Sequence, residues 1–148
     1  MVNNEWKKTQ LGAVMDFKNG LNTEKSNYGN GVKFVNVMDV FKNDILTEDK
    51  IIGRINLDPK KIEDNLLEYG DILFNRTSET YDEIAMSAVY LDNKPATFGG
   101  FVIRGRPIKE TFDPNYSVYA FQSFDFRNQV IKLGQGAVRA NIIILPEN

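Results

Sequence analysis

Four hydrogen-bonding side chains stand in a row at 75–78, Asn-Arg-Thr-Ser, directly after the apolar run Ile72-Leu73-Phe74. The apolar run has the character of a buried strand, and Gly70-Asp71 before it predicts a tight turn. Asparagine, arginine, threonine and serine are side chains that bind phosphate oxygens and base edges. The strand therefore brings a guanidinium and three short polar side chains to one edge of the fold, where they either bind a partner or are held in place by Arg76 pairing with an acid.

Two more guanidinium groups, those of Arg104 and Arg106, lie two residues apart in the stretch GFVIRGRP. Residues two apart in an extended chain point to the same side, so the pair could grip phosphates or read guanine edges. The plainer interpretation is a strand that ends in a turn. The glycines of this stretch form neither of the common phosphate-binding loop patterns.

The chain contains no histidine and no cysteine. Their absence excludes Ser-His-Asp catalysis, imidazole and thiolate metal ligands, cysteine nucleophiles and disulfides. An enzyme built from this chain would have to use carboxylates, lysine, tyrosine or groups borrowed from a partner. Self-contained catalysis is correspondingly disfavoured.

Charge is distributed unevenly along the 148 residues, although the net charge is only −2. Residues 1–36 hold five Lys/Arg and three Asp/Glu, residues 37–93 hold six and thirteen, and residues 94–148 hold seven and four. The acidic total argues weakly against nucleic-acid binding. A local basic face can coexist with it, because charges act over about 8–10 Å in physiological salt.

The stretch DPNY at 113–116 resembles the Asp/Asn-Pro-Pro-Tyr signature of amino-directed DNA methyltransferases. In that signature the aromatic ring stacks on a flipped base. Here Asn115 replaces the second proline, and no glycine-rich turn for S-adenosylmethionine follows a strand upstream. The favoured interpretation is a helix start with Tyr116 in the core. The acidic pairs of the middle segment match no calcium-loop spacing and are expected to be solvated.

Helices and short strands must position these side chains. The pattern predicts a helix over 11–17 capped by Thr9, a polar loop over 20–31, and a strand over 33–40. It then predicts a helix from Asp58-Pro59 toward Leu67, the strand at 72–74, and strands over 85–91 and 96–104 joined by a turn at 92–95. Two further helices are predicted. The first opens at Asp113-Pro114 and carries Tyr116, Tyr119, Ala120 and Phe124 at helical spacing. The second is capped by Asp125, has Phe126, Val130 and Ile131 inward, and ends at 134–136. An apolar segment covers 141–145. This mixture indicates an α+β fold.

The stretch Gly-Asp-Ile-Leu-Phe-x-Arg-x-Ser (70–78) resembles the target recognition domain of type I restriction-modification specificity subunits. Further pieces follow the order of that family and extend the resemblance over roughly residues 6–142: Trp6 before Leu11-Gly12, Gly20, Tyr28-Gly29, Pro114-x-Tyr116-x-x-Tyr119, Ser123, Arg127, Ile131, Gly136 and Asn141-Ile142. The resemblance implies a single α+β domain over 1–148, with a twisted, mostly antiparallel β core and several short flanking helices. In that core, Ile72 and Phe74 face inward, and Asp71 satisfies amides of the turn.

The resemblance further implies recognition of one half-site of a bipartite double-stranded DNA target, without catalysis by this chain. S-adenosylmethionine, ATP and magnesium are then expected only in partner methyltransferase and restriction subunits, and no cofactor in this chain. The family's long spacer helix is not part of the sequence, so we expect an isolated domain, a half-length subunit or a truncation, monomeric alone. No signal peptide and no membrane-length apolar run are evident, which predicts a cytoplasmic protein.

The DNA-contacting residues expected from side-chain type and loop position fall into two groups. Phosphate anchors are expected among Lys18, Lys25, Lys33, Arg104 and Arg139, and base readers among Asn22, Tyr28, Arg76, Thr77, Ser78 and Arg106. Two alternatives stay open: a minimal DNA-modifying enzyme fragment, and a DNA-mimicking or other protein-interaction module that acts on a methyltransferase.

Overall fold

A five-stranded sheet organises the computed structural model, which describes residues 11–78, 83–108, 113–134 and 140–141. Its strand order is β1-β9-β5-β7-β3. The strands are β1 (Met15–Asn19), β9 (Val102–Pro107), β5 (Ile72–Asn75), β7 (Ser87–Tyr90) and β3 (Ile45–Leu46). Every neighbouring pair is antiparallel except the parallel edge pair β3–β7. The predicted α+β class with a mostly antiparallel core is confirmed.

Two smaller sheets accompany the main one. Strands β4 (Gly53–Ile55), β2 (Tyr28–Val35) and β8 (Ala96–Phe98) form a three-stranded sheet, in which β2 pairs antiparallel with β4 and parallel with β8. Strands β6 (Thr77–Ser78) and β10 (Ala140–Asn141) form a two-stranded antiparallel pair. The helical segments are α1 (Leu11–Val14), η1 (Lys25–Asn27), α2 (Val37–Lys42), η2 (Glu48–Lys50), α3 (Pro59–Glu63), α4 (Pro114–Ala120) and α5 (Phe124–Gly134).

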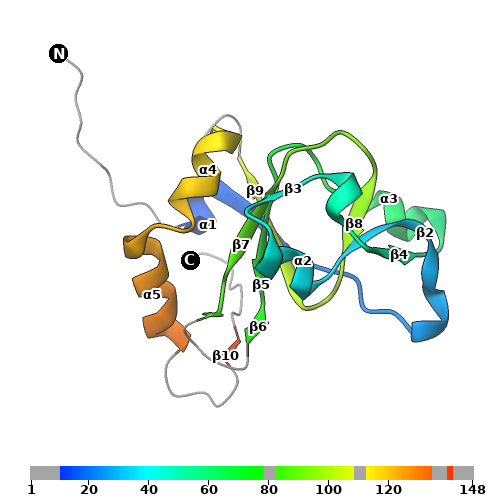
Figure 1. Cartoon of the computed structure of the whole chain (residues 1–148), viewed down its shortest axis with the longest axis horizontal. Helices are drawn as coiled ribbons and strands as arrows, with labels where there is room; N and C mark the ends of the chain where they lie inside the picture. The colour runs from blue at the N-terminus through cyan, green and yellow to red at the C-terminus, as the bar shows by residue number, and fades with distance from the viewer. Residues whose placement is uncertain (1–10, 79–82, 109–112, 135–139, 142–148) are drawn as a thin grey trace.

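The two faces of the main sheet bury different hydrophobic clusters, because neighbouring residues of a strand point to opposite faces. Leu73 and Ala88 belong to a cluster that includes residues of α2, β2 and β8. Ile72, Phe74 and Val89 belong to a second cluster, which includes residues of α4, α5 and the segment between them. The main sheet is thus covered on one face by α2 and the three-stranded sheet β4-β2-β8, which we call the small sheet. The other face is covered by α4 and α5 (Figure 1).

The turn that precedes β5 has the form predicted from Gly70-Asp71. Gly70 has a φ of +92°, a conformation that side chains with a Cβ rarely adopt. The Asp71 carboxylate accepts a hydrogen bond of 2.7 Å from the backbone N–H of Glu68, so it satisfies a turn amide. All four residues of β5 are buried, which confirms that Ile72 and Phe74 face the core.

Two of the predicted elements are wrong in type. Residues 15–19 form β1 instead of continuing a helix from Leu11, and they pair with β9 along their whole length. The predicted strand over 33–40 ends at Val35, and α2 follows. Asn36 begins this helix: its backbone N–H donates to Asp39 Oδ2 at 2.9 Å, which closes a capping box that the apolar alternation concealed.

Other predicted boundaries shift. The loop predicted over 20–31 contains η1 and the start of β2, the helix predicted toward Leu67 ends at Glu63, and the strand predicted over 96–104 is divided into β8 and β9. The turn at 92–95 is present, but it connects strands of different sheets. The predictions for Thr9, for residues 135–136 and for residues 142–145 concern positions outside the described residues.

The C-terminal helices expose several aromatic rings, among them Tyr116, which the sequence predicted in the core. Asp113 accepts a hydrogen bond of 2.8 Å from the backbone N–H of Asn115 at the start of α4, as its capping position predicts. Tyr116 and Tyr119 are exposed, however, while Ser117 is buried. Phe124 is also exposed. Because it is the first residue of α5, the predicted capping residue Asp125 lies inside the helix. Ser123 takes the capping role instead, since its hydroxyl accepts a hydrogen bond from the backbone N–H of Phe126. Val130 is buried, and Phe126 and Ile131 are half-buried.

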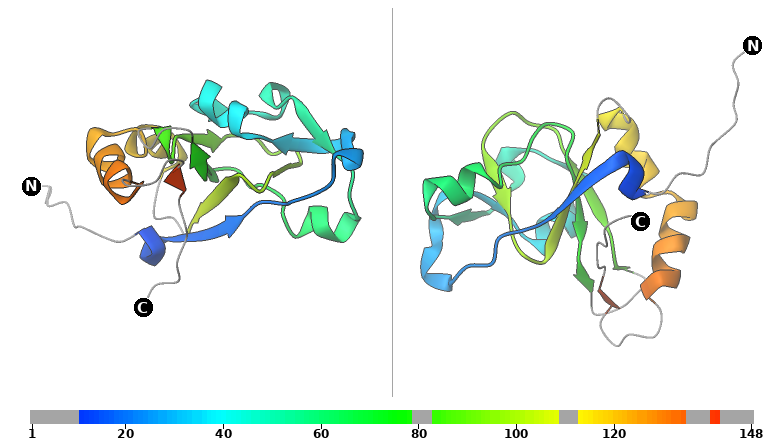
Figure 2. Two further views of the ribbon diagram at one scale, coloured as in Figure 1. Left: turned by 90° about the horizontal axis from the view of Figure 1, so that it is seen from below. Right: turned by 180° about the vertical axis from the view of Figure 1, so that it is seen from behind.

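The small sheet and the α5 helix lie toward opposite ends of the long axis of the molecule, as the views in Figures 1 and 2 agree. Within the described ranges, no helix is long and apolar enough to cross a membrane.

Candidate nucleic-acid interface

A basic ribbon forms the end of the molecule opposite α5. We define the β2–β4 ribbon as residues 25–35, which comprise η1 and β2, together with β4 at 53–55. Its charged residues are Lys25, Lys33 and Arg54, and it contains no Asp or Glu. In a chain with a net charge of −2, this is a local concentration of positive charge.

Three residues bulge from the ribbon at 29–31, Gly-Asn-Gly. Tyr28 and Val32 both lie opposite Ile55 in the pairing of β2 with β4, so the residues between them have no partners on β4. Gly29 and Gly31 have φ values of +106° and +98°. A guanidinium nitrogen of Arg54 donates to the carbonyl oxygen of Gly31 at 2.9 Å. The bulge is therefore fixed at its base by a neighbouring strand.

Two adjoining surface hollows surround Tyr28 at the side of the ribbon, with volumes of about 160 and 380 Å³. The Tyr28 ring packs against Phe34 with 5.6 Å between ring centroids, and Tyr28 remains 46% exposed. The lining residues, which we call the Tyr28 groove, are Leu21, Asn22, Thr23, Tyr28, Gly29, Phe34, Asn36, Val37, Ile52, Gly53, Arg54, Gly99, Gly100, Phe101 and Val102. This surface contains the aromatic rings of Tyr28, Phe34 and Phe101 and the side-chain amides of Asn22 and Asn36, and its permanent charge comes from Arg54.

The turn 99–101 brings a further aromatic ring to the Tyr28 groove. Phe101 is 59% exposed. Beside it, the Asn22 side chain lies directly on Gly100, where an added Cβ would meet Asn22 Oδ1 at 1.9 Å. Arg76 supports this turn: its guanidinium donates to the carbonyl oxygen of Gly100 at 3.3 Å, and its backbone N–H donates to that of Phe101 at 2.8 Å. Asn22, Tyr28, Phe101 and Arg76 are thus brought close together from three separate segments.

Arg76 consequently has a role in holding a loop, through carbonyl groups. The expectation that 75–78 emerges as a unit at a rim is wrong for its first residue, because Asn75 is fully buried. Neither amide atom of its side chain has a hydrogen-bond partner within the described part of the chain. Thr77 and Ser78 pair through β6 with β10, and Arg139 lies outside the described residues.

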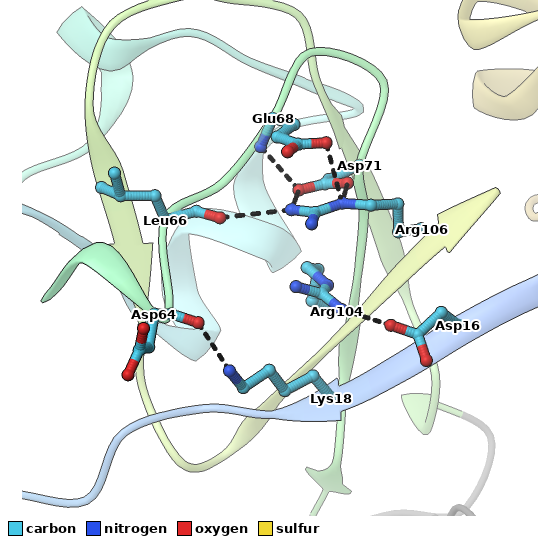
Figure 3. A network of polar contacts seen from close by, with 8 residues as sticks. All are labelled: Asp16, Lys18, Asp64, Leu66, Glu68, Asp71, Arg104 and Arg106. Carbon is cyan, nitrogen blue, oxygen red and sulfur yellow. Dashed lines mark hydrogen bonds and ion pairs between the residues drawn. The ribbon is translucent and has the colours of Figure 1, made fainter. Parts of the chain in front are cut away.

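Three of the predicted DNA-contacting cations, Lys18, Arg104 and Arg106, lie together in a polar network on β1 and β9 (Figure 3). Lys18 pairs in register with Arg104, and Arg106 with Asp16. The Lys18 ammonium donates to the carbonyl oxygen of Asp64 at 2.6 Å. Together with the contacts of Arg106, this bond ties the first and ninth strands to the segment 64–71.

Arg104 is buried, with only 4% of its surface exposed. Its guanidinium donates to Asp16 at 3.0 Å, and its Nε has no partner among the described residues. Burial lowers the pKa of Arg104, and the neighbouring charge of Arg106 lowers it further. In this conformation the guanidinium is not placed to reach a phosphate on the surface.

Arg106 forms a two-point ion pair with Asp71. Its Nε and one terminal nitrogen each lie 2.8 Å from an Asp71 carboxylate oxygen, and the same terminal nitrogen donates to the carbonyl of Leu66 at 3.2 Å. Glu68 adds an ion pair at 3.2 Å. The hydrogen bonds to Asp71 raise the pKa of Arg106. These contacts give Arg106 a structural function; the DNA contacts expected of it and of the other ten candidates stay predictions.

Of the remaining candidates, Lys25 and Lys33 both lie on the β2–β4 ribbon. Lys33 donates to the carbonyl oxygen of Ile51 at 2.6 Å, whereas Lys25 is exposed. Sequence reasoning missed Asn30, Arg54 and Phe101. The Gly-Asn-Gly pattern could have indicated Asn30, because it is typical of a projecting turn. Arg54 and Phe101 depend on strand pairings that no local pattern reveals.

Comparison with solved structures identifies the architecture. A chain from a type I R-M system, solved in a study of its complex assembly and conformational transition, matches with a TM-score of 0.62 and 18% identity over 97% of this chain. The S subunit of the type I restriction-modification system from M. genitalium matches with a TM-score of 0.55 and 19% identity over 97% of this chain. The HsdS subunit from Thermoanaerobacter tengcongensis matches with a TM-score of 0.54 and 14% identity over 90% of this chain. The chain has the fold of part of a type I S subunit.

The likeness is structural, and it confirms at the level of fold the resemblance found in the sequence. This chain spans about a third of each solved chain, covering 32%, 33% and 37% of their lengths. No family model matches the sequence, and a search of curated proteins gives no match.

Proposed function

We propose that this chain recognises one half-site of a bipartite duplex DNA target, as the specificity component of a type I restriction-modification system. The observation that carries the proposal is the β2–β4 ribbon, which holds Lys25, Lys33 and Arg54 without a single carboxylate at one end of an S-subunit fold. Beside it, the Tyr28 groove offers aromatic rings and amides, which suit base edges more than simple ions.

The antiparallel pairing of β2 with β4 gives the ribbon two strands, a form that can contact DNA through the major groove. That groove is about 12 Å wide and admits a two-stranded β-ribbon. Once the bulge at 29–31 enters the groove, the exposed Lys25 lies on a segment that follows the adjacent phosphates. Phosphate contacts fix the register of the protein on the duplex, and contacts with base edges select the sequence.

The chain performs no chemistry of its own under this proposal, and it requires no cofactor. The lack of histidine and cysteine supports this part, since the commonest acid–base and nucleophilic groups are missing. Methylation with S-adenosylmethionine and ATP-dependent cleavage would belong to partner methyltransferase and restriction subunits.

Selection from a randomised duplex DNA pool at low salt, followed by sequencing of the retained duplexes, tests the proposal. The expected result is a short enriched motif. Retention without enrichment would show electrostatic binding alone and contradict sequence recognition by this chain. An absence of retention even at low salt would favour the alternative of a protein-interaction module, which direct binding to a methyltransferase would then test.

A matched pair of variants locates the contact surface. Lys25→Ala removes an exposed charge from the ribbon, and Lys132→Ala removes one from α5 at the opposite end. We expect Lys25→Ala to weaken binding to all sequences alike and to reduce the dependence of log K on log salt by about one unit. Lys132→Ala should leave both quantities unchanged. Equal effects of the two variants would contradict the assignment of the ribbon.

A further inference from the structure

Asn30 occupies the middle of the bulge that projects from the β2–β4 ribbon. It is exposed, and its side chain has no hydrogen-bond partner among the described residues. The residues on both sides are glycines with positive φ, and space is open beside Gly29, where an added Cβ would meet nothing within 4 Å. A polar side chain without a partner is therefore presented at the end of the molecule with little around it.

The bulge is held firmly enough to position that side chain. Gly31 lies against the opposite strand so closely that an added Cβ would be 2.2 Å from the carbonyl oxygen of Ile55. Arg54 secures the carbonyl of Gly31 at 2.9 Å. On the other flank, the Tyr28 ring packs on Phe34. An ordered support lowers the entropy lost when a side chain binds, which is a requirement for reading a base edge.

The chemistry of the ribbon points to one base. Arginine and lysine pair with guanine, carboxylates accept from cytosine, and asparagine pairs with the N6 and N7 groups of adenine through two hydrogen bonds. The guanidinium of Arg54 donates to Gly31 and the ammonium of Lys33 donates to Ile51. Lys25 lies on η1, outside the bulge, and the ribbon has no carboxylate. The amide of Asn22 lies down on Gly100 within the Tyr28 groove. Asn30 is the side chain at the projecting position.

We propose that Asn30 reads an adenine of the recognised half-site in the major groove. This inference rests on the proposed function and adds to it the residue and the base. Because the support of the bulge comes from Gly31, Arg54 and Tyr28, removal of the Asn30 side chain should leave the ribbon intact.

The test compares the unaltered chain with Asn30→Ala and with a control, Asn93→Ala, which removes an exposed amide from the turn at 92–95. Each is used in selection from the randomised duplex pool, and the folded content is checked by circular dichroism. We expect Asn30→Ala to lose the preference for adenine at one position, by about 5- to 150-fold, and to keep the preferences at the others. Asn93→Ala should reproduce the unaltered motif.

A modified base gives a second measurement. Replacing the adenine at the affected position by 7-deaza-adenine removes the N7 acceptor. It should weaken binding by the unaltered chain and have no effect on binding by Asn30→Ala.

Each contrary result has a distinct meaning. If the unaltered chain enriches a motif and Asn30→Ala enriches the same one, the adenine assignment is overturned and the proposed function stands. If Asn30→Ala lowers affinity for every sequence equally, Asn30 contacts the backbone of DNA, which also overturns the assignment. If the unaltered chain enriches nothing, the proposed function fails and the adenine assignment fails with it.

Discussion

Removal of the Arg106 guanidinium should destabilise the fold strongly. Arg106→Ala leaves the Asp71 carboxylate, whose side chain is 1% exposed, without the two hydrogen bonds of 2.8 Å that now neutralise it. Among the described side-chain hydrogen bonds of Asp71, the one from the backbone N–H of Glu68 remains. A buried charge without a partner is costly, because the protein interior solvates it far less well than water does.

The size of the loss follows from the burial of the two partners. Removing one member of a buried ion pair lowers the free energy of unfolding by about 3–5 kcal/mol, whereas an exposed pair contributes about 0–1 kcal/mol. Arg106 is 28% exposed and Asp71 is almost fully covered, so the pair belongs mainly to the first class. The Lys60–Asp64 pair, with 75% and 53% exposure at 3.5 Å, belongs to the second and gives the control Lys60→Ala.

Equilibrium unfolding in urea measures both variants. We expect Arg106→Ala to lose about 3–5 kcal/mol, a large share of the roughly 5–15 kcal/mol that stabilises a domain, and Lys60→Ala to lose less than about 1 kcal/mol. Adding Asp71→Asn to Arg106→Ala should restore part of the loss, because the amide carries no charge. A loss in Arg106→Ala no larger than that in Lys60→Ala would refute the reasoning. Such a result would return Arg106 to the candidates for reading bases.

Three further predictions concern single groups. Burial raises the pKa of Tyr90 to about 12, and its hydroxyl donates to the carbonyl of Lys94. Folding therefore favours the neutral phenol, and the stability that this preference contributes is lost as pH rises from 10 through 12. In an absorbance titration, Tyr90→Phe should remove a tyrosine ionisation near pH 12, and an unchanged titration near that pH would contradict the assignment. Burial also raises the pKa of Asp39, so the ionised carboxylate opposes folding at pH 7. In urea, Asp39→Ala should lose about 1 kcal/mol with the capping box, and Asp39→Asn, which keeps the acceptor, should lose little; equal losses would argue against the box. Gly29→Ala introduces strain of about 1–2 kcal/mol from its positive φ. Gly31→Ala should lower the melting temperature more, since its Cβ also meets a backbone oxygen at 2.2 Å; a smaller loss than in Gly29→Ala would show that the bulge is not anchored there.

Local patterns predicted the parts of the fold that local forces determine. The turn at Gly70-Asp71, the burial of β5 and the capping of α4 by Asp113 follow from backbone conformation, hydrophobic character and side-chain hydrogen bonds within a few residues. The segment 36–40 was predicted wrongly because Val35 and Val37, two residues apart, fit a strand. The capping box at Asn36 and the spacing of Val37 and Val40 favour a helix instead. Tyr116 and Tyr119 have helical spacing, yet the neighbouring Ser117 faces inward.

The candidate interface could be predicted only in part. Asn22, Lys25, Tyr28 and Lys33 lie in one polar stretch of sequence, and the structure keeps them near one end of the molecule. The partners of the arginines come from distant segments: Arg104 and Arg106 bind acids 88 and 35 residues away. Sequence spacing gives no information about such pairs, because strand pairing decides them.

The position of β1 at the edge of the main sheet has a consequence for the order of folding during synthesis. In the described part of the chain β1 pairs with β9, which comes much later in the sequence and ends at Pro107. An emerging chain therefore holds β1 without this partner until Val102–Pro107 have left the ribosome. Pairings between strands so distant in sequence form slowly. The exposed strand edge is open to mispairing over that interval. A ribosome stalled after β9 has emerged should leave β1 protected from proteolysis, whereas one stalled before β9 has emerged should leave β1 open to cleavage.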